Sequence, residues 1–182
     1  MERFWNYIYY FIFLFECKTS LLFRKVLNII FYPITYIRCI KSSLEKKGTS
    51  FKKIDKAVTK SLNNSKYGNS ITIADIHMGG ILALLEYSIF NFIQAFLGKS
   101  LIQYIWENSL NKFIFITGLL IIPNIINNHL LWKNDKYLSY FKEFDKEPKE
   151  VKQKWAWISL GVVIGSILLL IFSFWVMTKA IY

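Results

Sequence analysis

The sequence is poor in cysteine, proline and acidic residues. Its 182 residues include two cysteines, Cys17 and Cys39, three prolines, and 12 Asp/Glu against 23 Lys/Arg. Two cysteines without a Cys-x-x-Cys motif exclude a disulfide framework, so we expect both to be small apolar fillers. Glu16-Cys17-Lys18, rather than a small-residue cleavage site, follows the first apolar run over residues 4–15. A cleaved signal peptide is therefore not expected.

Sequence motifs of enzymes and of metal sites are also missing. HExxH, GxSxG, GxxxxGK[ST] and GxGxxG do not occur. The two histidines cannot supply the usual zinc ligands without well-placed cysteines or carboxylates. We predict that the protein is not an enzyme, with no catalytic residue, no metal, no cofactor and no small-molecule substrate.

What the sequence does contain is apolar surface. Hydrophobic residues make up 54% and aromatic residues 18% of the chain, and the mean hydropathy is +0.31. A soluble domain of this size cannot bury so much apolar surface. The net charge of +11 is typical of membrane proteins with basic cytoplasmic loops, and we do not expect nucleic acid as a partner. The prediction is an all-α, polytopic membrane protein in contact with the lipid bilayer.

Three uncharged runs are long enough to cross a bilayer: residues 77–98 (apart from Glu86), 113–132 and 155–178. The last run would span about 36 Å as a helix, against a hydrocarbon core of about 30 Å. Pro123 is expected to kink the second. Tryptophans favour the headgroup region. The expected interfacial anchors are Trp5, Trp132, Trp155, Trp157 and Trp175.

The amino-terminal part is harder to assign. The apolar runs 4–15 and 26–37 are too short to cross, so residues 1–41 are predicted to form interfacial or re-entrant helices. A pair of tilted spans is the alternative. A basic cytoplasmic connector, residues 42–70, is expected to follow and to lead into a three-span domain, residues 71–182.

The basic residues alternate along the chain and predict its orientation. Lys and Arg number nine in residues 38–66, two in 98–112, seven in 133–154, and one after the last span. Because short basic loops stay in the cytoplasm, we expect a multi-pass membrane protein with its amino terminus in the cytoplasm and its carboxyl terminus outside. The 133–154 loop is expected to form an amphipathic helix on the membrane surface.

Several residues inside the predicted spans are candidates for contacts. A carboxylate at mid-depth is costly, so Glu86 is expected to be a proton or ion site, a contact to a partner helix, or a neutral carboxyl bonded inside the bundle, for example to Asn127 or His129. Small residues allow close helix packing with another span or with a second copy. The candidate polar contacts are Glu86, Asn91, Gln94, Asn124, Asn127, Asn128 and His129, and the candidate packing residues are Gly79, Ala83, Gly161 and Gly165.

The stretch from Leu130 to Met177 combines a basic, aromatic segment, the sequence Lys154-Trp-Ala-Trp and a serine-bearing span. It resembles the carboxyl ends of small polytopic membrane immunity proteins, which are encoded beside contact-dependent or type VI secretion toxins, notably in Bacteroidetes. The resemblance covers about a quarter of the chain and transfers no functional residue. It implies an inner-membrane immunity protein that binds a cognate toxin.

Two alternatives rest on the residues themselves. Gly161-x-x-x-Gly165, Glu86 and Pro123 are compatible with a homo-oligomeric pore or membrane effector, for example in phage defence. The second alternative is that the protein is an accessory subunit of a larger membrane complex.

Overall fold

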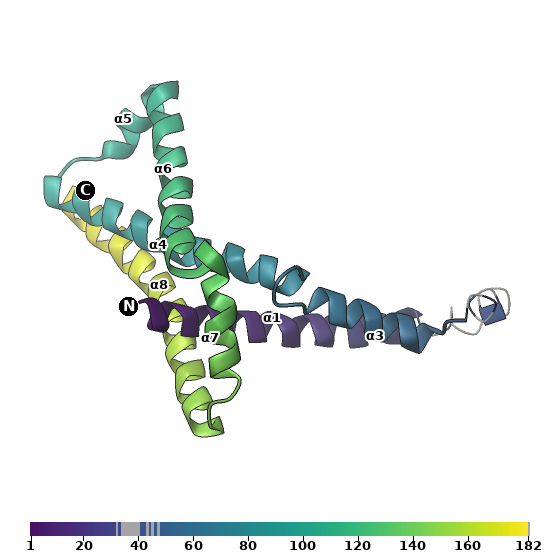
Figure 1. Cartoon of the computed structure of the whole chain (residues 1–182). Coiled ribbons are helices and arrows are strands. Elements are labelled where there is room, and N and C mark those ends of the chain that lie inside the picture. Colours follow the sequence, from purple (N-terminus) through teal and green to yellow (C-terminus); the bar gives the residue numbers. More distant parts are fainter. Residues whose placement is uncertain (32, 34–40, 43, 45, 47, 182) are drawn as a thin grey trace. The chain divides into compact units, whose positions relative to one another are not determined.

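A computed structural model describes residues 1–31, 33, 41, 42, 44, 46 and 48–181 (Figure 1). Its described part is helical and contains no strand, which confirms the all-α prediction. Cys39 and most of the run 26–37 beyond Phe31 lie outside the described residues. The helices are α1 (Glu2–Phe31), α3 (Phe51–Leu62), α4 (Asn69–Leu97), α5 (Leu101–Glu107), α6 (Ser109–Asn127), α7 (Lys136–Phe144) and α8 (Lys149–Ile181).

Three helical stretches are long and apolar enough to cross a membrane: Asn69–Leu97, Ser109–Phe144 and Lys149–Ile181. Each contains one predicted span to within a residue, so the prediction of a membrane protein with three candidate spans is confirmed. α1 is not among the candidate spans, although it has 30 residues.

The chain forms two compact units. Unit 1 comprises Met1–Phe11 and Ile76–Tyr182, and unit 2 comprises Ile12–Asp75. The division falls inside α1 and α4 and not at the expected borders after residues 41 and 70. Residues 1–11 belong with the membrane-spanning helices because their side chains are buried among them.

α1 is one continuous helix that includes the charged residues Glu16, Lys18, Arg24 and Lys25 between the two apolar runs. Neither proline nor glycine interrupts residues 2–31, and the intervening charged residues are good helix formers. The charges do not break the helix because unit 2 accommodates them: Glu16 is buried, and Arg24 is ion-paired with Asp55.

The chain turns sharply between α6 and α7. α6 continues through Pro123, a π-helical turn covers Asn128–Trp132, and a short 3₁₀ turn covers Lys133–Asp135. Asn134 and Asp135 have φ of 61° and 53°. Asn and Asp tolerate this left-handed conformation better than other residues with a side chain. The turn lets α7 leave the direction of α6.

α7 has the predicted amphipathic pattern, but its aromatic face does not lie on lipid. Tyr137, Phe141 and Phe144 are buried, and Tyr9 and Tyr10 of α1 pack against them. The expected role of this face as a membrane-surface anchor is therefore replaced by contact with the first turns of the chain.

Candidate partner-binding site in the membrane-spanning helices

α4 and α8 are joined by buried polar side chains. The Asn91 amide donates to the Ser173 hydroxyl at 3.0 Å, and the Gln94 amide lies 3.3 Å from the Met177 sulfur. Asn91 and Gln94 are completely buried. The residue numbers of the two contacts rise together, from Asn91 to Gln94 on α4 and from Ser173 to Met177 on α8. The two helices therefore run parallel, side by side (Figure 1).

Gln94 also connects α4 to the next helix. Its side-chain oxygen accepts the backbone N–H groups of Leu101 and Ile102, at 2.8 and 3.3 Å. These are the first two residues of α5, whose N–H groups have no partner within their own helix. The amide therefore caps α5.

α8 presents small residues on two faces. Ser159, Ser166 and Ser173, seven residues apart, are buried inside unit 1. Gly161 and Gly165 lie on a different face, and a Cβ added at either would meet nothing within 4 Å. The same holds for Gly79 of α4, while Ala83 is half-buried. The serines are used within the unit, whereas the glycine positions are open.

Glu86 does not make the expected hydrogen bond. Both carboxylate oxygens are covered by protein, yet neither has a hydrogen-bond partner among the described residues. The Asn127 oxygen accepts the Trp5 indole N–H at 2.9 Å, and no bond from Glu86 to Asn127 or His129 is formed.

The polar residues at the end of α6 separate into two groups. Asn127 is completely buried against Trp5. Asn124, Asn128 and His129 are exposed, and their side chains make no hydrogen bond within the described part of the chain. The neighbouring exposed residues of α6 are apolar, such as Leu120, whose exposed fraction is 68%. Unit 1 therefore leaves a polar strip on an otherwise apolar helix.

The first turns of α1 dock on this helix end beside the polar strip, a contact that the sequence does not reveal. The Asn6 amide donates to the Leu130 carbonyl at 3.1 Å. The Tyr7 ring lies between Phe144 and Trp155, with centroid distances of 3.7 and 4.1 Å. The only sequence signal is the density of aromatic residues, which is equally typical of an interfacial segment.

Acidic residues after α7 hold the tyrosines and arginine of this segment. Tyr7 donates to Glu147, and Tyr10 donates to Asp145. Burial, followed by the hydrogen bond to Glu147, raises the pKa of Tyr7, and burial with the bond to Asp145 raises the pKa of Tyr10. Arg3 pairs with Glu143 at 2.9 Å, outside the buried cluster.

The tryptophans differ in their surroundings. Trp157 and Trp175 are exposed, by 66% and 59%, as expected of side chains that face lipid or its headgroups. Trp155 is half-buried by its stacking on Tyr7, and Trp132 is half-buried at the end of the π-helical turn. Trp5 is buried.

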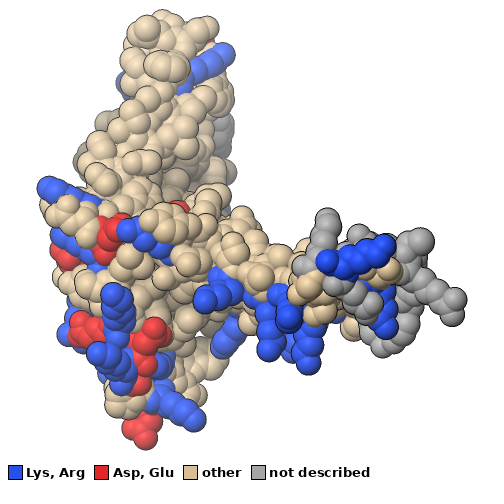
Figure 2. Space-filling view, turned by 45° about the vertical axis from the view of Figure 1, so that its right-hand side comes forward, with Lys and Arg blue, Asp and Glu red and all other residues tan. Residues whose placement is uncertain are grey.

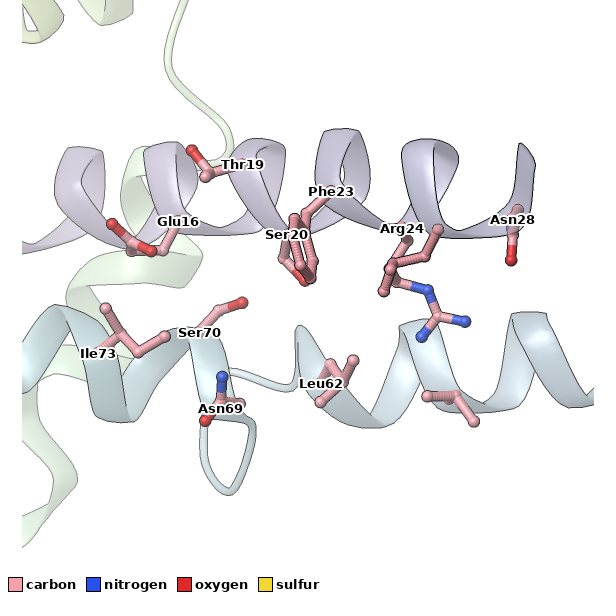
Figure 3. A pocket seen from close by; sticks show the side chains of 12 residues that line it. Glu16, Thr19, Ser20, Phe23, Arg24, Asn28, Leu62, Asn69, Ser70 and Ile73 are labelled. Atoms are coloured by element: carbon pink, nitrogen blue, oxygen red, sulfur yellow. The ribbon is translucent and has the colours of Figure 1, made fainter. Parts of the chain in front are cut away.

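Unit 2 contains a groove of about 600 Å³ between α1 and the α3–α4 segment (Figure 3). Its lining mixes apolar residues with Glu16, Arg24, Asn28 and Ser70. The Arg24 charge is already neutralised by Asp55. Hydrogen bonds from Arg24 and Asn28 hold the pKa of Asp55 below its usual range. Cys17 is half-buried here, and its burial raises the pKa of the thiol despite a hydrogen bond with Ser70.

The fold and these contacts define a class: an all-helical protein with three candidate membrane spans and a separate, basic helical unit. In the described part of the chain, no three His, Cys, Asp or Glu side chains are grouped as metal ligands would be. Comparisons of the chain with protein-family models, with curated proteins and with solved structures give no match.

Proposed function

We propose that the chain is an immunity protein of a bacterial inner membrane, which neutralises a cognate secreted toxin by binding its membrane-inserted helix along α6. The observation that carries the proposal is the exposed polar strip formed by Asn124 and Asn128. Four residues apart, these side chains share one face of the helix. The resemblance of residues 130–177 to immunity proteins supplies the biological class.

The depth of Asn124 makes lipid an unfavourable neighbour. It lies twelve residues after Lys112 and nine before Lys133. At about 1.5 Å per residue, these distances are about 18 and 14 Å, which places the amide near the middle of a core of about 30 Å. Without a hydrogen bond, a primary amide is costly in hydrocarbon. Asn and Gln in such positions commonly bond to polar residues of a neighbouring helix.

The occupant we propose is one helix of the toxin with a polar side chain at the level of Asn124. Exposed apolar residues beside the strip, among them Leu120 and Ile121, would pack against that helix. The amide would fix its register, since a shift by one turn leaves both polar groups unpaired.

The experiment is a protection assay with the toxin encoded by the neighbouring gene. Deleting the whole gene should make cells sensitive. Replacing both amides, Asn124→Leu with Asn128→Leu, should reduce survival at least tenfold at an unchanged membrane level. The matched control is Ile122→Leu with Ile125→Leu, exposed positions on the same helix, and it should protect fully. If deletion leaves sensitivity unchanged, the proposed function is wrong. If deletion sensitises the cells but the amide variant still protects them normally, the function stands and the proposed site is wrong.

Self-association is the second candidate, because another copy would bring the same exposed amides and the same open Gly161 and Gly165 positions. It would correspond to a homo-oligomeric pore or effector. In a chain without Cys17 and Cys39, Asn124→Cys should then form disulfide-linked dimers in membranes, and overexpression should depolarise cells. Monomers with a normal membrane potential would favour the immunity function.

A further inference from the structure

Unit 2 carries most of the positive charge of the protein. Residues 12–75 contain twelve Lys/Arg and four Asp/Glu, a net charge of +8 out of +11 for the whole chain. In Figure 2, Lys and Arg side chains project from this unit. Such a concentration of charge attracts an anionic surface.

The outer side of α1 in this unit is apolar. Phe15, Leu22, Val26 and Ile29 are exposed by 64%, 62%, 54% and 75%. Their spacing of seven, four and three residues places them on one face of the helix. This stripe is one-sided, continuous over four turns, and unpartnered within the unit.

The inner side of the same helix carries charged residues among apolar ones. Glu16 is only 8% exposed, and the Arg24 side chain only 16%. Both line the groove (Figure 3). A soluble protein exposing this stripe while burying its charges would be prone to aggregate. The arrangement suits a helix whose outer face meets lipid.

Two lysines border the stripe. Lys18 lies four residues before Leu22, and Lys25 four residues before Ile29, and both are exposed. Lysines in such positions can extend their charged ends to phosphate groups while their methylene chains lie along apolar surface.

α3 adds a second group of cations. Lys52, Lys53, Lys56 and Lys60 are exposed and fall on one side of this helix, while Val58 and Leu62 on the other side line the groove. Ser50 caps the helix by accepting the Lys53 N–H at 3.3 Å. The charge is therefore displayed by an ordered helix and not by an extended tail.

We propose that unit 2 is a peripheral membrane module: the stripe of α1 inserts into the headgroup region of a leaflet rich in anionic phospholipid, and the lysines of the unit select that leaflet. The occupant is lipid because of the charge complementarity and because unit 2 includes the first residues of α4, which is itself a candidate span. In this proposal α1 lies in the interface instead of crossing, because it is not among the helices long and apolar enough to span.

The test places a fluorophore on the stripe of the full-length protein in nanodiscs. In a chain with Cys17→Ala and Cys39→Ala, an environment-sensitive dye is attached at Leu22→Cys or Ile29→Cys. Ser61→Cys is the control, an exposed position on α3 that belongs neither to its lysine side nor to the groove. Lipids carrying a shallow spin label should quench the two stripe positions at least twofold more than the control. Quenching at the two stripe positions should also increase when phosphatidylglycerol replaces part of the phosphatidylcholine.

Two results would overturn the proposal. One is equal, weak quenching at all three positions, which means that the stripe faces water. The other is a blue-shifted dye that lipid spin labels do not quench, which means that protein, a partner or a second copy, covers the stripe. Replacing Lys52, Lys53, Lys56 and Lys60 with Gln should reduce the response to phosphatidylglycerol, and an unchanged response would remove the role of α3. None of these readouts depends on a toxin, so this proposal and the immunity function fail independently.

Discussion

At the scale of single residues, two buried side chains of α1 form hydrogen bonds with the end of α6 and the turn that follows it. The Trp5 indole N–H donates to the Asn127 oxygen at 2.9 Å, and the Asn6 amide donates to the Leu130 carbonyl at 3.1 Å. That carbonyl belongs to the π-helical turn, where the regular helix bonds are displaced. The irregular end of α6 thus provides acceptors for α1. Asn127 looked like the other polar residues of this segment in the sequence, and only its partner distinguishes it.

Removing the Asn127 acceptor should destabilise unit 1. Asn127→Leu leaves the buried Trp5 N–H without a partner, and we expect a loss of about 1–3 kcal/mol in the free energy of unfolding. Thermal unfolding in detergent, followed by tryptophan fluorescence, measures the change. The control Asn128→Leu alters an exposed side chain and should change stability by less than about 0.5 kcal/mol. Equal effects of the two variants would contradict the role assigned to Asn127.

At the scale of elements, α1 serves two environments along its length. Its first turns are embedded among α6, α7 and α8, and its remainder forms the groove of unit 2 with α3. The three candidate spans could be predicted from the sequence because a bilayer demands a fixed length of uncharged helix. The docking of Tyr7 on Phe144 could not, because the partners are 137 residues apart and apolar patterns do not identify which surface covers them.

The Tyr7 side chain should be the main attachment of α1 to α7. Tyr7→Ala removes a ring stacked on both sides, and we expect a loss of about 3–5 kcal/mol. Tyr7→Phe keeps the stacking but loses the hydrogen bond to Glu147, with an expected loss of about 1 kcal/mol. Hydrogen exchange of α7 amides reports both changes. Similar losses in the two variants would show that the hydrogen bond, and not the stacking, holds the segment.

The contact between α1 and α3 should weaken in acid. Hydrogen bonds from Arg24 and Asn28 lower the pKa of Asp55 in the folded protein. A group whose pKa is lowered by folding stabilises the fold above its unfolded pKa of about 3.9, and that contribution is lost as the pH falls through the lower, folded value. Hydrogen exchange of α3 should therefore accelerate, relative to its intrinsic rate, below about pH 4. Asp55→Asn should abolish this pH dependence; if the dependence persists, another carboxylate is responsible.

At the scale of the whole molecule, two structural findings agree with a topology of three crossings, and both would hold in either orientation of the chain. α4 and α8 run parallel, as the first and third of three crossings must. Residues 1–11 contact α7 and the segment after it through ion pairs such as Arg3–Glu143, so both belong on one side of the membrane. The charge counts along the sequence predict which loops face the cytoplasm. The packing of the exposed face of α6 cannot be read from them, because lipid and a partner helix select the same apolar residues.

The orientation itself is a prediction that labelling can decide. In a chain without Cys17 and Cys39, single cysteines at Lys99 and Lys179 should react with a membrane-impermeant maleimide on spheroplasts. Cysteines at Lys142 and Lys56 should react only after lysis. This pattern follows because the loops containing Lys142 and Lys56 hold seven and nine basic residues, which resist export, whereas the loop after α4 holds two. The inverse pattern would reverse the orientation. Labelling of Lys56→Cys but not Lys142→Cys from outside would instead mean an additional crossing between the two, and would exclude the cytoplasmic placement of unit 2.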